Sequence, residues 1–108
     1  MTDQTSDFRR LGPSDAVPND FVVPYYIDDR KRRISVARVA DELYAFDDLC
    51  THEACPLSAG KLDGTVIMCQ CHGSRFDVTT GAVVNGPATK PLTVYPVHES
   101  NGQIQAGI

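Results

Sequence analysis

Apolar and polar side chains alternate with a period of two along several short stretches of the chain, which is the pattern of a half-buried β-strand. The clearest example is Arg-Ile-Ser-Val-Ala-Arg-Val at residues 33–39. The other stretches are rich in β-branched and aromatic residues, which favour strands. We therefore expect strands near residues 8–11, 21–27, 33–39, 43–46, 65–68, 75–78, 92–98 and 103–106.

Turn-forming residues separate these stretches. Residues 28–32 are expected at the tip of one hairpin, and residues 99–102 at the tip of a closing hairpin made by 92–98 and 103–106. Pro24 cannot donate a backbone hydrogen bond, so its strand should lie at a sheet edge or carry a bulge. Short strands with frequent turns and no long helical pattern predict an all-β fold, an antiparallel β-sandwich or barrel. We expect a single domain over residues 1–108, with the polar residues 1–7 frayed.

The net charge of −4 is unevenly distributed, because residues 34–108 hold four basic and eight acidic side chains. An acidic chain is a poor match for phosphate groups, so no nucleic acid is expected as a partner. The excess negative charge is open to two interpretations, attraction to a basic partner surface or simple solubility. The basic run Arg30–Arg33 is likewise either a docking patch or a solvated turn.

Membrane and export signals are absent from the sequence pattern. No stretch is long and apolar enough to span a membrane, so no membrane association is expected. Residues 1–7 have neither the positive start nor the apolar stretch of a secretory signal. The expected location is therefore cytoplasmic.

Two short motifs carry the candidate chemistry, Cys50-Thr51-His52 and Cys69-Gln70-Cys71-His72. Each motif offers one thiolate and one imidazole, and four such ligands indicate a metal site. A structural Cys₂His₂ zinc site is one interpretation, but zinc fingers usually pair like ligands with like. Here each pair is mixed, and the first is only Cys-x-His, which argues against such a zinc site.

These motifs resemble the signature of Rieske iron–sulfur proteins. The flanking segments Cys55–Ser58, Gly73–Asp77, Thr80-Gly81 and Asn85–Ala88 extend the resemblance over about residues 8–108. It implies one Rieske [2Fe–2S] cluster, with Cys50 and Cys69 on the inner iron and His52 and His72 on the outer iron. Neutral imidazoles on one iron raise the potential to roughly −150 to +300 mV. The resemblance also implies an antiparallel β-sandwich with a small cluster-binding subdomain of about residues 48–78 at one end.

The resemblance assigns roles to residues around the ligands. Cys55 and Cys71 match a cysteine pair that forms a disulfide between the two ligand loops in Rieske proteins of cytochrome bc complexes, while the ferredoxin subtype usually lacks it. The alternative is a pair of small buried thiols. Backbone N–H groups near Gly73 and the Ser74 hydroxyl are candidate donors to cluster sulfurs, and a local turn bond is the alternative for Ser74. Phe76 stands where the high-potential subtype has Tyr. Pro87 belongs to the family's proline loop, which covers the cluster.

The function implied is that of a soluble Rieske ferredoxin, an electron carrier and not an enzyme by itself. It would carry single electrons from a flavin-dependent ferredoxin reductase to the terminal oxygenase of a multicomponent aromatic-ring dioxygenase, as used in aromatic hydrocarbon catabolism. The edge of His52 and His72 is the expected electron port, surrounded by Pro56, Leu57, Pro87 and Ala88. The alternatives are a small Rieske subunit of an assimilatory nitrite reductase, a redox- or metal-sensing module, and a zinc-stabilised interaction domain. Visible absorption separates the cluster from zinc.

Overall fold

A computed structural model describes residues 8–51 and 55–108. In this part of the chain it contains eleven strands and three short 3₁₀ helices. In chain order these are β1 (Phe8–Pro13), η2 (Ser14–Ala16), β2 (Phe21–Ile27), η3 (Asp28–Arg30), β3 (Arg32–Val39), β4 (Glu42–Asp47), η4 (Leu57–Ala59), β5 (Lys61–Asp63), β6 (Val66–Met68), β7 (Arg75–Asp77), β8 (Val83–Asn85), β9 (Val94–Tyr95), β10 (Val97–Ser100) and β11 (Gln103–Gly107). Residues 1–7, which were predicted to be frayed, lie outside the described part of the chain.

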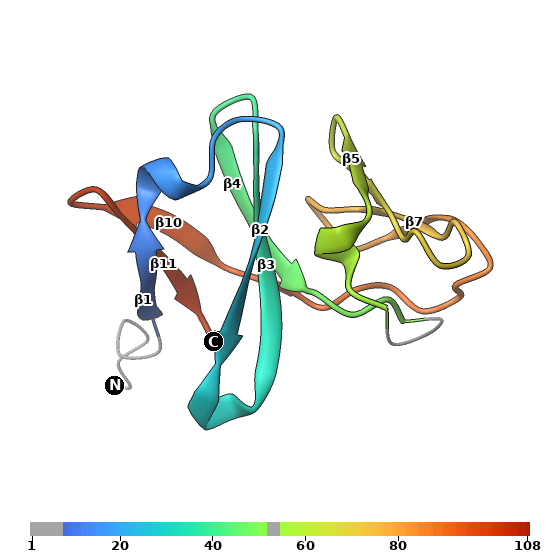
Figure 1. Ribbon diagram of the computed structural model, residues 1–108, viewed down its shortest axis with the longest axis horizontal. Coiled ribbons are helices and arrows are strands. Elements are labelled where there is room, and N and C mark those ends of the chain that lie inside the picture. The colour runs from blue at the N-terminus through green and yellow to red at the C-terminus, as the bar shows by residue number, and fades with distance from the viewer. Residues whose placement is uncertain (1–7, 52–54) are drawn as a thin grey trace.

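The strands form three antiparallel sheets that lie side by side along the long axis of the molecule (Figure 1). Their orders are β1-β11-β10, β2-β3-β4-β9 and β5-β6-β7-β8. One apolar core, centred on Val17, Val36 and Ile104, joins the first two sheets. A second core, which includes Phe46, Ile67 and Phe76, joins the middle sheet to the third. The predicted all-β antiparallel fold is confirmed.

Strand β3 is the centre of the molecule. Residues 34–37 are all buried, so the prediction of a half-buried strand is wrong for its middle. Val36 faces the first core, and Ala37 faces the core shared with the third sheet. The alternating pattern placed residues on two faces correctly, but a small side chain such as Ala37 did not reveal that its face is covered too.

The stretch 92–98 is not one strand of a closing hairpin. Val94 and Tyr95 form β9 and pair with β4, whereas β10 starts at Val97 and pairs with β11. Pro96 separates the two strands and has no N–H for a continuous ladder. The chain therefore crosses from one sheet to another where the sequence predicted a single element. Pro24 behaves as expected, because β2 is an edge strand.

The third sheet is the candidate cluster-binding subdomain. Its outer strands β5 and β8 have only three residues each, too short for a clear alternating pattern, and neither was predicted. Because β8 pairs with β7, this sheet continues to Asn85, beyond the expected range of about 48–78.

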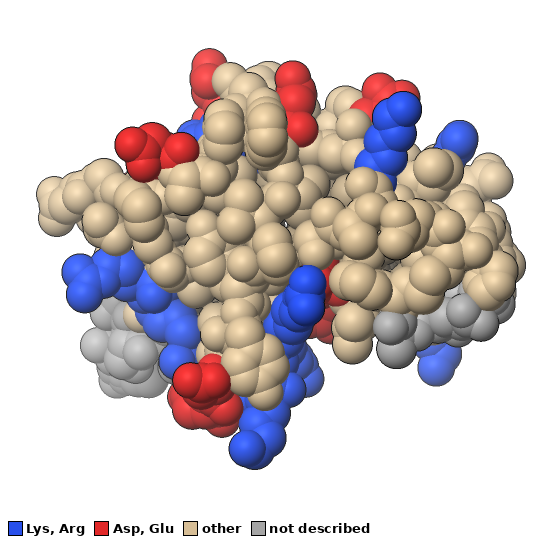
Figure 2. All heavy atoms as spheres, viewed as in Figure 1, with Lys and Arg blue, Asp and Glu red and all other residues tan. Residues whose placement is uncertain are grey.

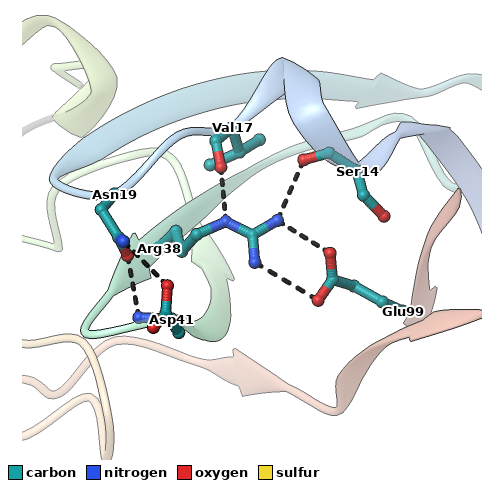
Figure 3. A network of polar contacts seen from close by, with 6 residues as sticks. All are labelled: Ser14, Val17, Asn19, Arg38, Asp41 and Glu99. Carbon is teal, nitrogen blue, oxygen red and sulfur yellow. Dashed lines mark hydrogen bonds and ion pairs between the residues drawn. The ribbon is translucent and has the colours of Figure 1, made fainter. Parts of the chain in front are cut away.

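Arg38 ties the edge of the sandwich together (Figure 3). Its Nε donates to the carbonyl of Val17 at 2.6 Å, and its Nη2 donates to the carbonyl of Ser14 at 2.9 Å. The same guanidinium pairs with Glu99 of β10 at 2.9 Å. Beside it, Asn19 and Asp41 exchange two hydrogen bonds of 2.9 and 2.8 Å, which hold the β3–β4 turn.

Only part of the basic run Arg30–Arg33 is available to dock a partner. Lys and Arg side chains gather at the end of the molecule where the β2–β3 hairpin lies (Figure 2). Arg33 is ion-paired with Asp48, and Arg32 donates to the Tyr95 hydroxyl at 2.9 Å. Arg30 and Lys31 make no side-chain hydrogen bond or ion pair with any residue of 8–51 or 55–108. Two of the four cations thus have structural partners. Within the same described residues, no helix has the length and apolarity needed to cross a membrane.

Candidate metal centre

Two loops at the end of the β5–β8 sheet carry the candidate ligands. The first ligand loop, residues 48–58, follows β4, and the second, residues 69–74, joins β6 to β7. Within the first, the N–H of Cys50 donates to the carbonyl of Cys55 at 2.9 Å. Within the second, the N–H of Cys69 donates to the carbonyl of Ser74 at 2.8 Å, and Gly73 turns the chain with a φ of 79°. A positive φ of this size favours glycine.

The two predicted thiolate ligands lie together in the protein interior. Cys50 is 5% exposed and Cys69 is 1% exposed, neither is in a disulfide, and their side chains are hydrogen-bonded to each other. Burial raises the pKa of the Cys69 thiol above its ordinary value, because water no longer stabilises the thiolate. The backbone N–H groups of Cys71 and His72 point at the Cys69 sulfur and act in the opposite direction. The loop is therefore arranged to donate hydrogen bonds to negative charge on sulfur.

This donor set fits a metal cluster. Two buried thiols side by side are poor acids by themselves, but a bound metal cation deprotonates a coordinating thiol. The N–H donors around Cys69 match the sulfur-directed hydrogen bonds that tune iron–sulfur centres. His72 is exposed and has a contact of its own within the structure. His52, the fourth predicted ligand, lies outside the described residues.

A disulfide joins the two ligand loops, as the family resemblance implied. Cys55 and Cys71 are bonded, with their Cα atoms 6.5 Å apart. The sulfurs of this pair lie within 4.8 Å of the Cys69 sulfur. Because both are consumed in the bond, neither is available as a replacement metal ligand.

The segment 85–90, which begins with the proline loop Asn85–Ala88, is tied to both ligand loops. The Thr51 hydroxyl donates to the carbonyl of Lys90 at 2.6 Å, and the Ala88 N–H donates to the Ser74 hydroxyl oxygen at 3.0 Å. The Gly86-Pro87 peptide is cis, and Pro87 is exposed. Ser74 is fully buried and bonds to a residue 14 positions away, so its bond is not a local turn contact. As an acceptor from Ala88 it still has its own hydrogen to donate.

Two residues expected around the electron port are instead part of the core. Leu57 is 0% exposed and Ala88 is 4% exposed. Both pack with Phe76, Cys50 and Cys69, so they support the ligands from inside and cannot meet a partner. The exposed apolar side chains nearby in sequence are Leu49, at 45%, and Val84, at 51%.

Sequence reasoning also missed a buried polar group at the base of the site. Asp48 is 0% exposed and so is Ser35, whose hydroxyl donates to the Asp48 carboxylate at 2.6 Å. A serine inside an apolar strand and an aspartate two residues before Cys50 were the available signals. Neither residue reveals its hydrogen-bonding partner until the fold is known.

Comparison with protein families matches residues 8–96 to the Rieske [2Fe-2S] domain. The chain is 45% identical over 71 residues to Ferredoxin CarAc from Metapseudomonas resinovorans, an alignment that covers 66% of each chain. It is 39% identical over 90 residues to the ferredoxin component of naphthalene 1,2-dioxygenase/salicylate 5-hydroxylase systems from Ralstonia sp, covering 83% of this chain and 85% of that one.

Solved structures that contain a ferredoxin also match this fold. The fold matches a chain in a complex of reduced oxygenase and oxidised ferredoxin in carbazole 1,9a-dioxygenase with a TM-score of 0.87 and 31% identity, covering 97% of this chain and 94% of that one. It also matches the Sphingomonas yanoikuyae B1 ferredoxin with a TM-score of 0.87 and 33% identity, covering 93% of this chain and 97% of that one.

Proposed function

The chain belongs to the Rieske [2Fe-2S] domain family, and from this membership we propose that it is the ferredoxin component of an aromatic-ring dioxygenase system. It receives single electrons from a flavin-dependent reductase and delivers them to a terminal oxygenase. When bound, a Rieske cluster accepts and releases one electron at a potential of roughly −150 to +300 mV. The chain is a carrier in this proposal, and the oxygenase performs the catalysis.

The observation that carries the proposal is the pair of buried, adjacent thiols Cys50 and Cys69 between two disulfide-linked loops. We assign these cysteines to the inner iron and His52 and His72 to the outer iron. The exposure of His72 supports its assignment to the side from which electrons leave. The N–H groups that point at the Cys69 sulfur favour added negative charge there, and hence reduction.

The proline loop has a separate task, the exclusion of water. The bonds of the segment 85–90 to Thr51 and Ser74 hold it against both ligand loops. A drier site strengthens the hydrogen bonds to sulfur, because the local dielectric is lower. Pro87 on its outer side then belongs to the surface that a redox partner contacts.

Partners are proposed from the relatives. Ferredoxin components of several dioxygenase systems align with this chain, and one structural match is a chain in an oxygenase–ferredoxin complex. Such redox encounters bury less than about 1,200 Å². The relatives do not favour the nitrite reductase subunit, the sensing module or the zinc domain. We also propose a cytoplasmic location, where a disulfide such as Cys55–Cys71 is unusual; cell fractionation tests it.

The ligand assignment is tested by iron and sulfide analysis with visible and electron paramagnetic resonance spectra. The purified protein should contain two irons and two sulfides per chain, as the Rieske cluster requires. The His72→Ala protein should lose them, since the described residues contain no spare thiol or imidazole beside this position. A full cluster in that variant would refute the assignment.

The carrier role is tested by stopped-flow mixing of the reduced protein with an oxidised Rieske oxygenase. The oxygenase of carbazole 1,9a-dioxygenase is a suitable acceptor, because a structural match is a chain in its complex. We expect reoxidation of the ferredoxin in step with reduction of the oxygenase. A protein that holds the cluster but exchanges electrons with no flavoprotein reductase and no Rieske oxygenase would contradict the carrier role.

A further inference from the structure

We propose that Asp48 is a positioning residue for the metal centre: with Arg33 as its counter-charge, it closes the neck of the first ligand loop and holds Cys50 beside Cys69. The inference rests on the proposed cluster-binding function. It concerns a residue that is neither a ligand nor part of the ligand motifs.

The Asp48 carboxylate is fully buried and uses both oxygens. Its Oδ1 accepts from the Ser35 hydroxyl at 2.6 Å and from the Ser58 N–H at 2.7 Å. Its Oδ2 accepts from the Ser58 hydroxyl at 3.1 Å and pairs with the Arg33 guanidinium at 2.6 Å. Four donors on one carboxylate compensate for the loss of its water.

These bonds connect the two ends of the first ligand loop to the sandwich. Asp48 stands at the start of the loop, Ser58 at its end, and Ser35 in β3 of the middle sheet. Backbone hydrogen bonds join the same parts of the chain. The Asp48 N–H donates to the carbonyl of Arg33, and the Asp48 carbonyl accepts from the Leu57 N–H. Cys50 and Cys55 lie between these two ends. The network therefore fixes the position from which the Cys50 thiol is presented.

The ion pair also balances charge close to the ligands. Cys50 follows Asp48 by two residues, so their Cα atoms are at most about 7 Å apart. Asp48 is completely buried, whereas the Arg33 side chain is 45% exposed. A buried carboxylate without its cation is strongly unfavourable. Intact, the pair adds almost no net charge near the centre; removal of either member leaves the other uncompensated.

The positioning role is tested by hydrogen exchange on the protein as purified, read by mass spectrometry over residues 56–60. In Asp48→Ala, exchange of this segment should accelerate roughly tenfold or more, since the Ser58 N–H loses a charged acceptor. The matched control is Asp47→Ala, which removes the same charge one residue earlier from a carboxylate that accepts from Tyr95. Exchange that is unchanged in Asp48→Ala, or equally faster in Asp47→Ala, would overturn the proposal.

A second pair of variants keeps the test decisive if Asp48→Ala does not fold. Asp48→Asn preserves shape and leaves the Arg33 cation uncompensated, so it should raise the reduction potential. Arg33→Met leaves the carboxylate uncompensated and should lower the potential. If the two substitutions only loosened the structure, they would not shift the reduction potential in opposite directions. Potentials that move the same way in both variants, or in neither, would refute the balanced pair.

The outcomes also separate this inference from the proposed function. A protein that never binds iron would contradict the proposed function, and the exchange result over residues 56–60 would still decide whether Asp48 closes the loop. A protein that binds the cluster equally well with slow, unchanged exchange in Asp48→Ala would remove the positioning role and leave the ferredoxin assignment intact.

Discussion

Removal of the Cys55–Cys71 disulfide should destabilise the protein by about 3 kcal/mol. The bond links residues that are 16 positions apart, and its main effect in the chain-entropy model is to restrict the unfolded state. A closed loop of about 15 residues corresponds to roughly 3 kcal/mol at 25 °C. For a domain of about 100 residues, each 1 kcal/mol shifts the melting temperature by roughly 4–8 °C. The expected shift is therefore more than about 10 °C.

The measurement is urea and thermal unfolding of the iron-free protein, which avoids irreversible loss of a cluster. The Cys55→Ser/Cys71→Ser double variant is compared with the oxidised wild type and with the wild type kept in a thiol reductant. We expect the reduced protein and the double variant to lose similar stability, because both lack the same bond. The cluster-loaded double variant should also release iron to a chelator faster, since its two ligand loops separate more easily.

A difference of less than about 0.5 kcal/mol between the double variant and the oxidised wild type would contradict this prediction, because a disulfide typically contributes about 2–4 kcal/mol. A loss in the double variant with none on reduction of the wild type would also contradict it. That pattern would assign the effect to the substituted side chains.

Three further changes test other parts of the structure. Arg38→Met should cost about 3 kcal/mol in urea unfolding, because two backbone carbonyls lose a charged donor worth about 1.5 kcal/mol each. Arg38, followed by the Ser14 side chain, holds the pKa of Glu99 below its ordinary value, so wild-type stability should fall as the pH drops through that lowered pKa, and the variant should lose less. Phe76→Tyr should raise the reduction potential by a few tens of millivolts in voltammetry, because a hydroxyl beside the buried cysteines favours the reduced state; a full cluster with an unmoved potential would contradict this. Gly60→Ala should abolish folding or cost at least about 3 kcal/mol, since its Cβ would overlap the Met68 carbonyl oxygen; a normal melting curve would contradict this prediction.

The sequence predicted those features that depend on the chemistry of a single side chain or on the spacing of a few residues. The mixed pairs Cys50–His52 and Cys69–His72 indicated a metal site, because the chemistry of a ligand belongs to its side chain, and their resemblance to the Rieske signature implied two iron positions. Pro24 indicated an edge strand for an equally local reason, its missing N–H. The alternating pattern of residues 33–39 placed β3 correctly.

The tertiary structure decided what covers each face and which distant groups meet. Leu57 and Ala88 look like surface apolar residues beside a ligand loop, yet both are core residues, because the β5–β8 sheet closes over them. Val94 and Val97 belong to different sheets, because Pro96 has no N–H and breaks the stretch into β9, which pairs with β4, and β10, which pairs with β11.

The network at Asp48 is the sharpest case of this division. Its donors come from β3, from the far end of the first ligand loop and from a cation in a run that looks like a solvated turn. Sequence alone determined that a carboxylate stands two residues before Cys50. Only the packing of the loop against β3 determined that this carboxylate is buried. Burial in turn requires a counter-charge and hydrogen-bond donors, since a desolvated charge without them is too costly to keep in a folded chain.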